Sequence, residues 1–459
     1  MDQSVITRTI MVAPGRFAPG HLGELTQQVP FELVDAALAQ TGRTQARIRD
    51  LPARVVVYLL LAGCLFAEQG YGQVWQRLCA GLDGLPLATP TASALTQARR
   101  RLGPAPLRAL FGLLAGPAPT AATTGVRVGG LLVCAIDGTT MSVADTPANH
   151  GVYTTQPGHH GGSGYLLLRL VALVACGTRS LLAATFGPIS SGETTMTTKL
   201  IEHLHPGMLV LCDRNLTTAA LASRIAATGA QLLGRCKANR KLPVVGRCQD
   251  GSFVSLLGGV RVRVIDAEIT IATRAGRTHG SYRLATTLTD PHAWPAAELV
   301  ALYHQRWEIE TAYLELKSTI LGGRVLRART PQGIDQEVHA LLVCYQLLRL
   351  AMADATSTHP GVDPDRASFT IALQAARDQL IQAAGVLATT AVDLAGKIGR
   401  AVLDNLLADR RLRVSPRIVK RAISKYQARG PNLNRTSYKA TLSINILTPA
   451  GRLTTSAEP

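Results

Sequence analysis

The stretch YHQRWEIETAYLELK, residues 303–317, contains three glutamates and neither proline nor glycine. Its content of Glu, Leu, Ala and Arg predicts a helix. With about 100° between successive residues, that helix would gather four functional side chains within an arc of roughly 60°, namely Tyr303, Arg306, Glu310 and Lys317. Glu308 and Glu315 would face the opposite side. Taken alone, the stretch is better explained as a solvated helix with a weak Arg306–Glu310 ion pair, so the rest of the chain has to decide its role.

The composition indicates a folded protein with a polyanionic partner. The 459 residues suffice for two or three domains, and 47% hydrophobic with 17% charged residues is typical of a globular chain. The net charge of +18 favours nucleic acid over a membrane surface as the partner. No acidic residue lies between Asp409 and Glu458, where arginine and lysine accumulate. This segment is predicted to be either a disordered basic tail or a contact with a polyphosphate chain.

The cysteines and apolar runs favour a cytoplasmic protein without a membrane segment. The eight cysteines are scattered and form no C-x-x-C pair, which predicts reduced, structural thiols. Residues 1–15 lack the basic-then-apolar pattern of a signal peptide. The longest apolar run, Val55–Ala67, is shorter than the roughly 18 residues that a membrane span needs. It is therefore predicted to be a buried core helix.

Hydrophobic periodicity divides the chain into three regions. Residues 20–115 show helical periodicity, with Thr91 as a helix cap, and this domain is expected either to bind DNA ends through arginines or to be a plain bundle. Residues 126–350 alternate strands and helices, and their strand-rich block at about 231–290 reads as an insertion. Residues 351–459 are expected to be helical and to end in the basic tail.

Two short apolar runs of the middle region end in an aspartate. VGGLLVCAID ends at Asp137, and MLVLCD ends at Asp213. In open α/β sheets, functional groups gather beyond the carboxyl ends of such strands. A single aspartate there often only opens a turn, but two of them suggest a site.

Asp137, Asp213 and Glu310 form a candidate metal-binding set. Three converging carboxylates repel each other unless a divalent cation neutralises them. Oxygen ligands of this kind favour Mg²⁺ or Mn²⁺, and two such ions support in-line phosphoryl displacement without a Ser or Cys nucleophile. Arg306 and Lys317, on the face of Glu310, would then lie along the path of a DNA phosphate.

The spacing Y-x2-R-x3-E-x6-K over residues 303–317 resembles the Y-R-E-K signature of the insertion-element-four family of bacterial DDE transposases. The contexts AIDGTT around Asp137 and LVLCDRN around Asp213 are similar to that family as well. So are FELVDAALAQTG and ALTQARRRLG in the first region, and the resemblance extends over roughly residues 20–350.

The resemblance implies an α/β chain with a ribonuclease-H-like catalytic domain, interrupted by a β-rich insertion before the catalytic glutamate. It implies that Asp137, Asp213 and Glu310 are the catalytic residues and bind Mg²⁺ or Mn²⁺, as two ions. The implied reaction is cut-and-paste transposition: water frees a 3′-hydroxyl at the element end, that hydroxyl forms a hairpin, and the hairpin is reopened before joining to target DNA.

The resemblance also implies how the DNA is held. Tyr303, Arg306 and Lys317 correspond to residues on the 5′-phosphate side of the element end, and Trp294 is the candidate for stacking on a flipped base. The expected partner is double-stranded DNA, bound by a homodimer at two ends. Two alternatives stay open: a stand-alone metal-dependent nuclease or resolvase on the same fold, and a catalytically silent DNA-binding derivative.

Overall fold

The computed structural model describes eleven stretches of the chain, which are residues 9–11, 16–45, 49–118, 126–156, 164–237, 239–359, 361–383, 396–408, 413–414, 436 and 438–448. The chain forms two compact units. The first unit comprises Met1–His203 and Arg306–Leu406, and the second comprises Leu204–Gln305 and Leu407–Pro459. The division passes between Gln305 and Arg306, inside the stretch that carries the Y-R-E-K spacing.

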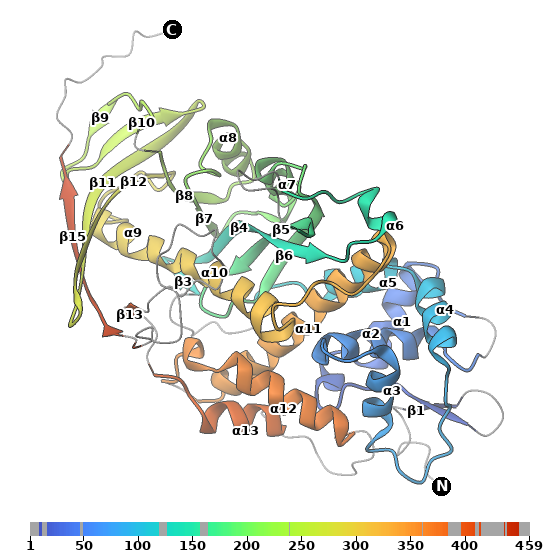
Figure 1. The fold of residues 1–459 in the computed structure, drawn as a ribbon. Helices are drawn as coiled ribbons and strands as arrows, with labels where there is room; N and C mark the ends of the chain where they lie inside the picture. The colour runs from blue at the N-terminus through green and yellow to red at the C-terminus, as the bar shows by residue number, and fades with distance from the viewer. Residues whose placement is uncertain are drawn as a thin grey trace. The chain divides into compact units, whose positions relative to one another are not determined.

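The N-terminal part of the first unit is mainly helical (Figure 1). Its elements are β1 (Thr9–Met11), β2 (Phe17–Pro19), the 3₁₀ turn Leu25–Gln27, α1 (Phe31–Gln40), α2 (Ala53–Leu65), α3 (Tyr71–Cys79), α4 (Ala92–Leu102) and α5 (Ala105–Leu114). Every residue of α2 except Arg54 is buried, so the prediction of a core helix is confirmed. The Thr91 hydroxyl accepts a hydrogen bond from the Ala94 amide and caps α4, as the sequence predicted.

Three further helices complete the helical core of the first unit. They are α11 (Pro331–Ser357), α12 (Phe369–Ile381) and α13 (Gly396–Asp404), and the 3₁₀ turn Pro364–Arg366 precedes α12. Helix α11 packs against α2, α5, α12 and α13. Within the described residues, α11 alone is long and apolar enough to cross a membrane, and most of it is buried inside the protein. A helix that is buried in the core of a protein can have the same length and apolar composition as a membrane-spanning helix.

The strands of the first unit form an antiparallel arrangement in the order β6-β5-β4. The elements here are β3 (Arg127–Val128), β4 (Leu131–Val143), α6 (Pro147–His150), β5 (Leu166–Ala175), β6 (Leu181–Pro188), α7 (Glu193–Thr198) and the 3₁₀ turn Ile201–His203. The expectation that a strand ends at Asp137 is wrong. Asp137 lies in the middle of β4, which stays paired with β5 as far as Val143. Threonines follow Asp137, and their β-branched side chains favour continuation of the strand.

The second unit begins with a parallel pair of strands. β7 (Met208–Cys212) pairs with β8 (Gln231–Arg235), and α8 (Ala219–Ala227) connects them. β9 (Gly246–Arg247), β10 (Phe253–Leu257), β11 (Val260–Thr273) and β12 (Gly276–Thr286) follow, and β12 pairs antiparallel with both β11 and β8. The sheet of this unit is therefore mixed, and α9 (Ala296–Tyr303) packs against β8 and β11.

The end of the chain returns to this sheet as a strand. β15 (Thr441–Leu447) pairs antiparallel with β11, from Asp266 opposite Leu447 to Ala272 opposite Thr441. Two shorter strands, β13 (Arg413–Val414) and β14 (Tyr438–Lys439), pair with each other. The expectation of a purely helical C-terminal region is therefore wrong, because the sequence TLSINIL alternates polar and apolar residues as a strand does. Most of the predicted basic tail after Asp409 lies outside the described residues.

All eight cysteines are free thiols, six of them buried. Burial raises the pKa of the Cys134 thiol to about 12. These properties agree with the prediction that the cysteines are structural.

Candidate active site

The stretch 303–317 is not one regular helix. α9 ends at Tyr303, a 3₁₀ turn covers His304–Arg306, α10 covers Trp307–Leu314, and a π-helical segment covers Glu315–Ile320. The uniform 100° step that the sequence argument assumed therefore does not apply over the whole stretch. Tertiary contacts set the direction of each side chain instead.

In the first unit, Arg306 joins two of the predicted carboxylates. Its Nη1 atom lies 3.0 Å from Asp137 Oδ2, and its Nη2 atom lies 2.7 Å from Glu310 Oε1. The Arg306 and Asp137 side chains are only 16% and 19% exposed. Asp137 comes from β4 and Glu310 from α10. The fold therefore brings two carboxylates from separate elements to the guanidinium of Arg306.

Tyr313 fixes α10 to the strand at Asp137. Its hydroxyl donates to the Asp137 carbonyl oxygen at 2.6 Å and accepts a hydrogen bond from the Ala172 amide at 3.0 Å. Asp137 and Ala172 are partners in the β4–β5 register, so the phenol bridges two paired strands. Burial, together with the nearby Asp137 charge, raises the pKa of Tyr313 well above its ordinary value of 10.0. The hydroxyl is therefore a stable neutral donor.

Lys317 and Glu193 lie beside the same segment of β4. The Lys317 ammonium donates to the Thr139 hydroxyl at 3.1 Å. The Glu193 carboxylate, at the start of α7, lies so close to Gly138 that a Cβ atom on residue 138 would overlap it. A glycine immediately after Asp137 thus allows a further carboxylate to approach this strand.

In the second unit, Asp213 directly follows β7, as predicted. Its Oδ1 atom accepts hydrogen bonds from the Asn215 and Leu216 amides, both at 2.8 Å. Tyr303 is buried, and its hydroxyl donates to the Cys212 carbonyl oxygen at 3.0 Å. Tyr303 thus packs onto the end of the strand that carries Asp213.

Trp294 lies just before α9 and is partly buried. Its backbone carbonyl accepts a hydrogen bond from Arg263 Nη1 at 2.5 Å, and Arg263 is itself buried and ion-paired with Asp250. The Asp250 carboxylate also accepts from the Ala296 amide at the start of α9. The stacking role of Trp294 stays a prediction.

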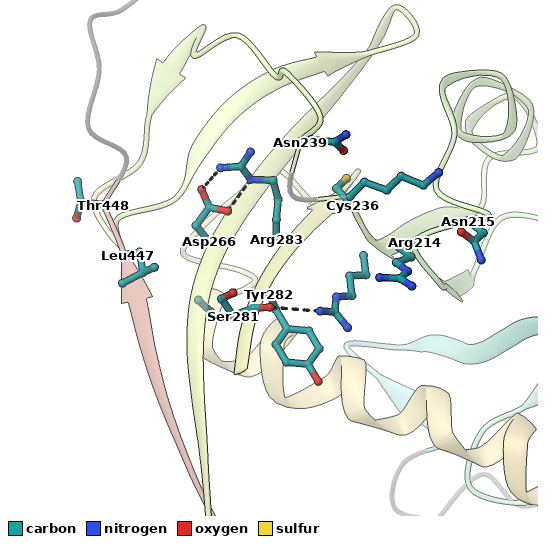
Figure 2. A pocket seen from close by; sticks show the side chains of 13 residues that line it. Arg214, Asn215, Cys236, Asn239, Asp266, Ser281, Tyr282, Arg283, Leu447 and Thr448 are labelled. Atoms are coloured by element: carbon teal, nitrogen blue, oxygen red, sulfur yellow. Dashed lines mark hydrogen bonds and ion pairs between the residues drawn. The ribbon is translucent and has the colours of Figure 1, made fainter. Parts of the chain in front are cut away.

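The second unit contains a polar pocket of about 850 Å³ (Figure 2). It is lined by Arg214 and Asn215 after β7, by 235–237 and Asn239, by Asp266 and Ala267 on β11, by 281–283 on β12, and by Leu447 and Thr448 near the chain end. The Arg235 guanidinium lies over the Tyr282 ring, 4.2 Å from its centroid. Arg283 forms a two-pronged ion pair with Asp266 at 2.7 and 2.9 Å, as Figure 2 shows. Arg214 and Lys237 are exposed at the pocket and make it basic.

No group of three or more His, Cys, Asp or Glu side chains has a metal-binding arrangement within the part of the chain that the structure describes. The donor chemistry nevertheless fits a hard divalent cation, because two carboxylates share one positive group, the guanidinium of Arg306. That guanidinium offsets part of the negative charge of the two carboxylates, which a divalent cation would offset in full.

Sequence reasoning missed Tyr313 and undervalued Glu193. Tyr313 lies three residues after Glu310 and seven after Arg306, a spacing that places it on their face and could have identified it. From the sequence, Glu193 could stand near the metals, but a turn or cap role is the better expectation, and it does begin α7. No local signal indicates that its carboxylate lies against Gly138.

Comparisons with known proteins identify the family of the chain. The insertion element 4 transposase N-terminal model matches residues 19–112, and the transposase DDE domain model matches residues 129–347. The transposase InsG for insertion sequence element IS4 of Escherichia coli (strain K12) is 27% identical over 408 residues, which cover 86% of this chain and 91% of InsG. The putative transposase InsZ of the same strain is 26% identical over 190 residues, which cover 41% of this chain and 62% of InsZ.

Among solved structures, the piggyBac transposase synaptic complex with hairpin DNA is similar with a TM-score of 0.43 and 10% identity, over 86% of each chain. Together, the family models and the relative define a metal-dependent, DNA-cleaving enzyme of the DDE class. The chain belongs to the insertion-element-4 family of DDE transposases.

Proposed function

We propose that Asp137, Asp213 and Glu310 bind two Mg²⁺ or Mn²⁺ ions in a ribonuclease-H-like catalytic domain. The observation that supports this most strongly is the Arg306 bridge, which joins Asp137 and Glu310 across separate elements. The position of Asp213 directly after a buried strand supports it as the third ligand. When bound, the ions supply the Lewis acidity for phosphoryl transfer.

The side chains of this site have distinct proposed roles. Asp137 and Glu310 hold negative charge where the DNA phosphate is attacked, and Tyr313 keeps β4 and α10 together so that the two carboxylates face one point. Arg306 offsets part of the charge of these carboxylates in the free protein, and with cations bound it would be available to contact a DNA phosphate. Lys317, already beside Thr139, contacts the same strand of DNA.

The proposed reaction is cut-and-paste transposition. A water oxygen bonds to phosphorus at the element end, and the bond from that phosphorus to the 3′-oxygen breaks, which leaves a 3′-hydroxyl and a 5′-phosphate. The oxygen of this 3′-hydroxyl then bonds to the phosphorus of the opposite strand, and the bond from that phosphorus to the 3′-oxygen of the flanking DNA breaks. The element end closes as a hairpin, and the flanking DNA leaves with a 3′-hydroxyl. A second water bonds to the hairpin phosphorus and frees the 3′-hydroxyl of the element, which then bonds to a target phosphorus and displaces a target 3′-hydroxyl. Each step exchanges one phosphorus–oxygen bond for another and needs no oxidant or organic cofactor.

Further contacts hold the DNA. Arg100 and Arg101 are exposed near the end of α4, and we propose that this helical domain, residues 20–115, binds the element ends. In the second unit we propose contacts from the basic pocket and Trp294. Tyr303 is buried and donates its hydroxyl to the Cys212 carbonyl oxygen, so we propose that it acts on the DNA interface by packing onto the strand before Asp213. A homodimer would hold two ends, and because bacterial DNA lies in the cytoplasm, we expect the enzyme to act there.

The test is an assay of the purified chain with a duplex that carries one end of its own element and flanking DNA. Native and denaturing gels separate a nick, a hairpin and a strand-transfer product. We expect all three with Mg²⁺ from the wild type, and none from Asp137→Ala, Asp213→Ala or Glu310→Gln, which should still bind the duplex. Glu298→Gln, an exposed carboxylate on α9, is the matched control and should cleave normally.

Three other results would contradict the proposal in different ways. Nicking without hairpin or joining by the wild type would indicate a nuclease or resolvase. Binding without cleavage in Mg²⁺ and in Mn²⁺ would indicate a silent DNA-binding derivative. Full cleavage by Glu310→Gln would show that the Glu310 carboxylate is not needed for catalysis.

A further inference from the structure

The side of α10 opposite Glu310 ends in a buried cluster of charges. Glu308 lies on this side, and its Oε2 atom accepts a hydrogen bond from Arg179 Nε at 2.6 Å. Arg179 also lies 3.5 Å from Glu315 Oε1 through Nη1 and forms an ion pair with Asp365. Its side chain is only 2% exposed. One arginine from the turn between β5 and β6 thus meets three carboxylates.

A second arginine completes the cluster from α11. Arg349, also buried, forms an ion pair with Glu315 and donates through Nε to the Tyr345 hydroxyl at 3.2 Å. The Tyr345 hydroxyl lies 3.1 Å from both Glu315 Oε2 and the Arg179 carbonyl oxygen. Burial raises the pKa of Tyr345, so its hydroxyl stays a neutral donor. We name these six residues the rear cluster: Arg179, Glu308, Glu315, Tyr345, Arg349 and Asp365.

The charges of the rear cluster require a fixed geometry, because buried charges are stable only when each one is paired and hydrogen-bonded. Arg179 also adopts a backbone φ of 58°, a left-handed conformation that is unfavourable for a residue with a Cβ atom. Such a residue persists where its contacts outweigh the strain, and the ion pairs to Glu308, Glu315 and Asp365 are those contacts.

The position of the rear cluster matters for α10 because that helix is short. It has eight residues, and a 3₁₀ turn and a π-helical segment flank it, so no long regular helix fixes its rotation. A rotation of about 20° would move a side-chain atom about 6 Å from the axis by about 2 Å. Displacements of about 1 Å at a reacting centre can cost about a hundredfold in rate.

We propose that Arg179 is a positioning residue for catalysis, because its ion pairs with Glu308 and Glu315 fix the rotation of α10 and keep Glu310 directed at Asp137. Tyr313 attaches α10 to β4 through its hydrogen bond to the Asp137 carbonyl oxygen. The rear cluster attaches the opposite side of α10 through the ion pair between Arg179 and Glu308. Glu308 and Glu315 therefore help to orient Glu310, the middle glutamate of the 303–317 stretch. This inference rests on the proposed function, since it concerns the alignment of the same carboxylates.

The test uses the full-length chain with Glu308→Gln. Glutamine keeps the shape and one acceptor for Arg179 but removes the charge. We expect single-turnover cleavage to fall about tenfold or more, while the dissociation constant for the element end changes less than twofold. We also expect weaker Mn²⁺ binding in calorimetry, a readout that does not depend on cleavage. Arg179→Lys should show the same pattern, and Arg179→Met should show a larger loss than Arg179→Lys, since lysine retains one ion pair.

The matched control is Glu337→Gln. Glu337 is also buried in the first unit, on α11, and pairs with Arg327 rather than with residues of α10. Thermal melting of both variants establishes that they are folded. An equal loss of cleavage in Glu308→Gln and Glu337→Gln, with unchanged Mn²⁺ affinity, would overturn the positioning role and leave the transposase mechanism intact. Absence of cleavage in the wild type would instead overturn the proposed function itself, and the inference with it.

Discussion

Arg306 Nη1 lies 3.0 Å from Asp137 Oδ2, and the same guanidinium reaches Glu310 at 2.7 Å. An arginine predicted to contact DNA thus binds the candidate catalytic carboxylates in the free protein. Its positive charge offsets part of the repulsion between these two neighbouring carboxylates. Arg306 therefore competes with divalent cations for the carboxylates of Asp137 and Glu310.

The first prediction follows from that competition. Arg306→Gln removes the positive charge that Asp137 and Glu310 share in the wild type, so the variant should melt at a lower temperature than the wild type in EDTA. Mn²⁺ should then raise its melting temperature more than that of the wild type, because the ion replaces the positive charge that the substitution removed. Arg54→Gln, which breaks an Arg54–Asp35 ion pair elsewhere in the first unit, should respond to Mn²⁺ as the wild type does. Equal Mn²⁺ shifts in Arg306→Gln and the wild type would refute this account.

Tyr313 yields a prediction about alkaline pH. Its pKa is raised above 10.0 by burial, so between the unfolded and the folded pKa the native state binds the extra proton. Stability contributed by Tyr313 is therefore present below pH 10 and is lost as the pH rises toward the folded pKa, at up to about 1.4 kcal/mol per pH unit. In Tyr313→Phe, the free energy of unfolding should fall less steeply above pH 10.

Tyr313→Phe should also lose about 1–3 kcal/mol at neutral pH, because the Ala172 amide and the Asp137 carbonyl lose their shared partner. Urea unfolding at a series of pH values measures both effects. The exposed Tyr165 provides the control, since Tyr165→Phe should change neither the slope nor the stability by a comparable amount. If the free energy of unfolding of Tyr313→Phe falls with pH as steeply as that of the wild type above pH 10, the Tyr313 phenol does not titrate as described.

The sequence could predict the structural context of one candidate aspartate, but not that of the other. Asp213 follows MLVLC, a short apolar run with a clear end, and it does lie just after a strand. Asp137 also follows an apolar run, yet the strand continues through Thr139 and Thr140 because β5 pairs with those residues too. Strand ends depend on the partner strand, which the local pattern does not contain.

Other contacts of the site were beyond sequence reasoning because they join distant segments. Tyr313 reaches β4 and β5, and Arg179 reaches α10 from a turn far earlier in the chain. Strand β15 was missed for a similar reason: its alternating pattern is visible, but its partner β11 lies far away in sequence. Helical periodicity, by contrast, is local, and the core helix α2 was predicted from it.

The basic pocket of the second unit should contribute to DNA affinity. Arg214→Ala and Lys237→Ala should each weaken binding and reduce the slope of log affinity against log salt by about one. Fluorescence anisotropy over a KCl series measures this slope. Arg277→Ala, an exposed position on β12 outside the pocket, is the control of equal charge. Identical slopes for the pocket variants and the wild type would exclude the pocket from the DNA interface.

The chain end should stabilise the sheet that carries this pocket. A chain that ends at Ala440 lacks β15, so the edge of β11 from Asp266 to Ala272 loses its backbone partners. Hydrogen exchange of peptides from that edge should accelerate, and DNA binding should weaken because Leu447 and Thr448 line the pocket. A chain that ends at Thr448 keeps β15 and should behave as the full chain does. Unchanged exchange in the shorter chain would mean that β15 pairing is unimportant.

The most direct test of the central claim is metal rescue of cleavage at Asp137 and Glu310. Asp137→Cys and Glu310→Cys replace a hard oxygen ligand by a soft sulfur ligand, which Mg²⁺ binds poorly and Mn²⁺ or Cd²⁺ bind better. We predict that both variants bind the element end, fail to cleave it in Mg²⁺, and regain cleavage when Mn²⁺ or Cd²⁺ is supplied. Normal cleavage by either variant in Mg²⁺ alone would contradict the claim that these two carboxylates hold the catalytic ions.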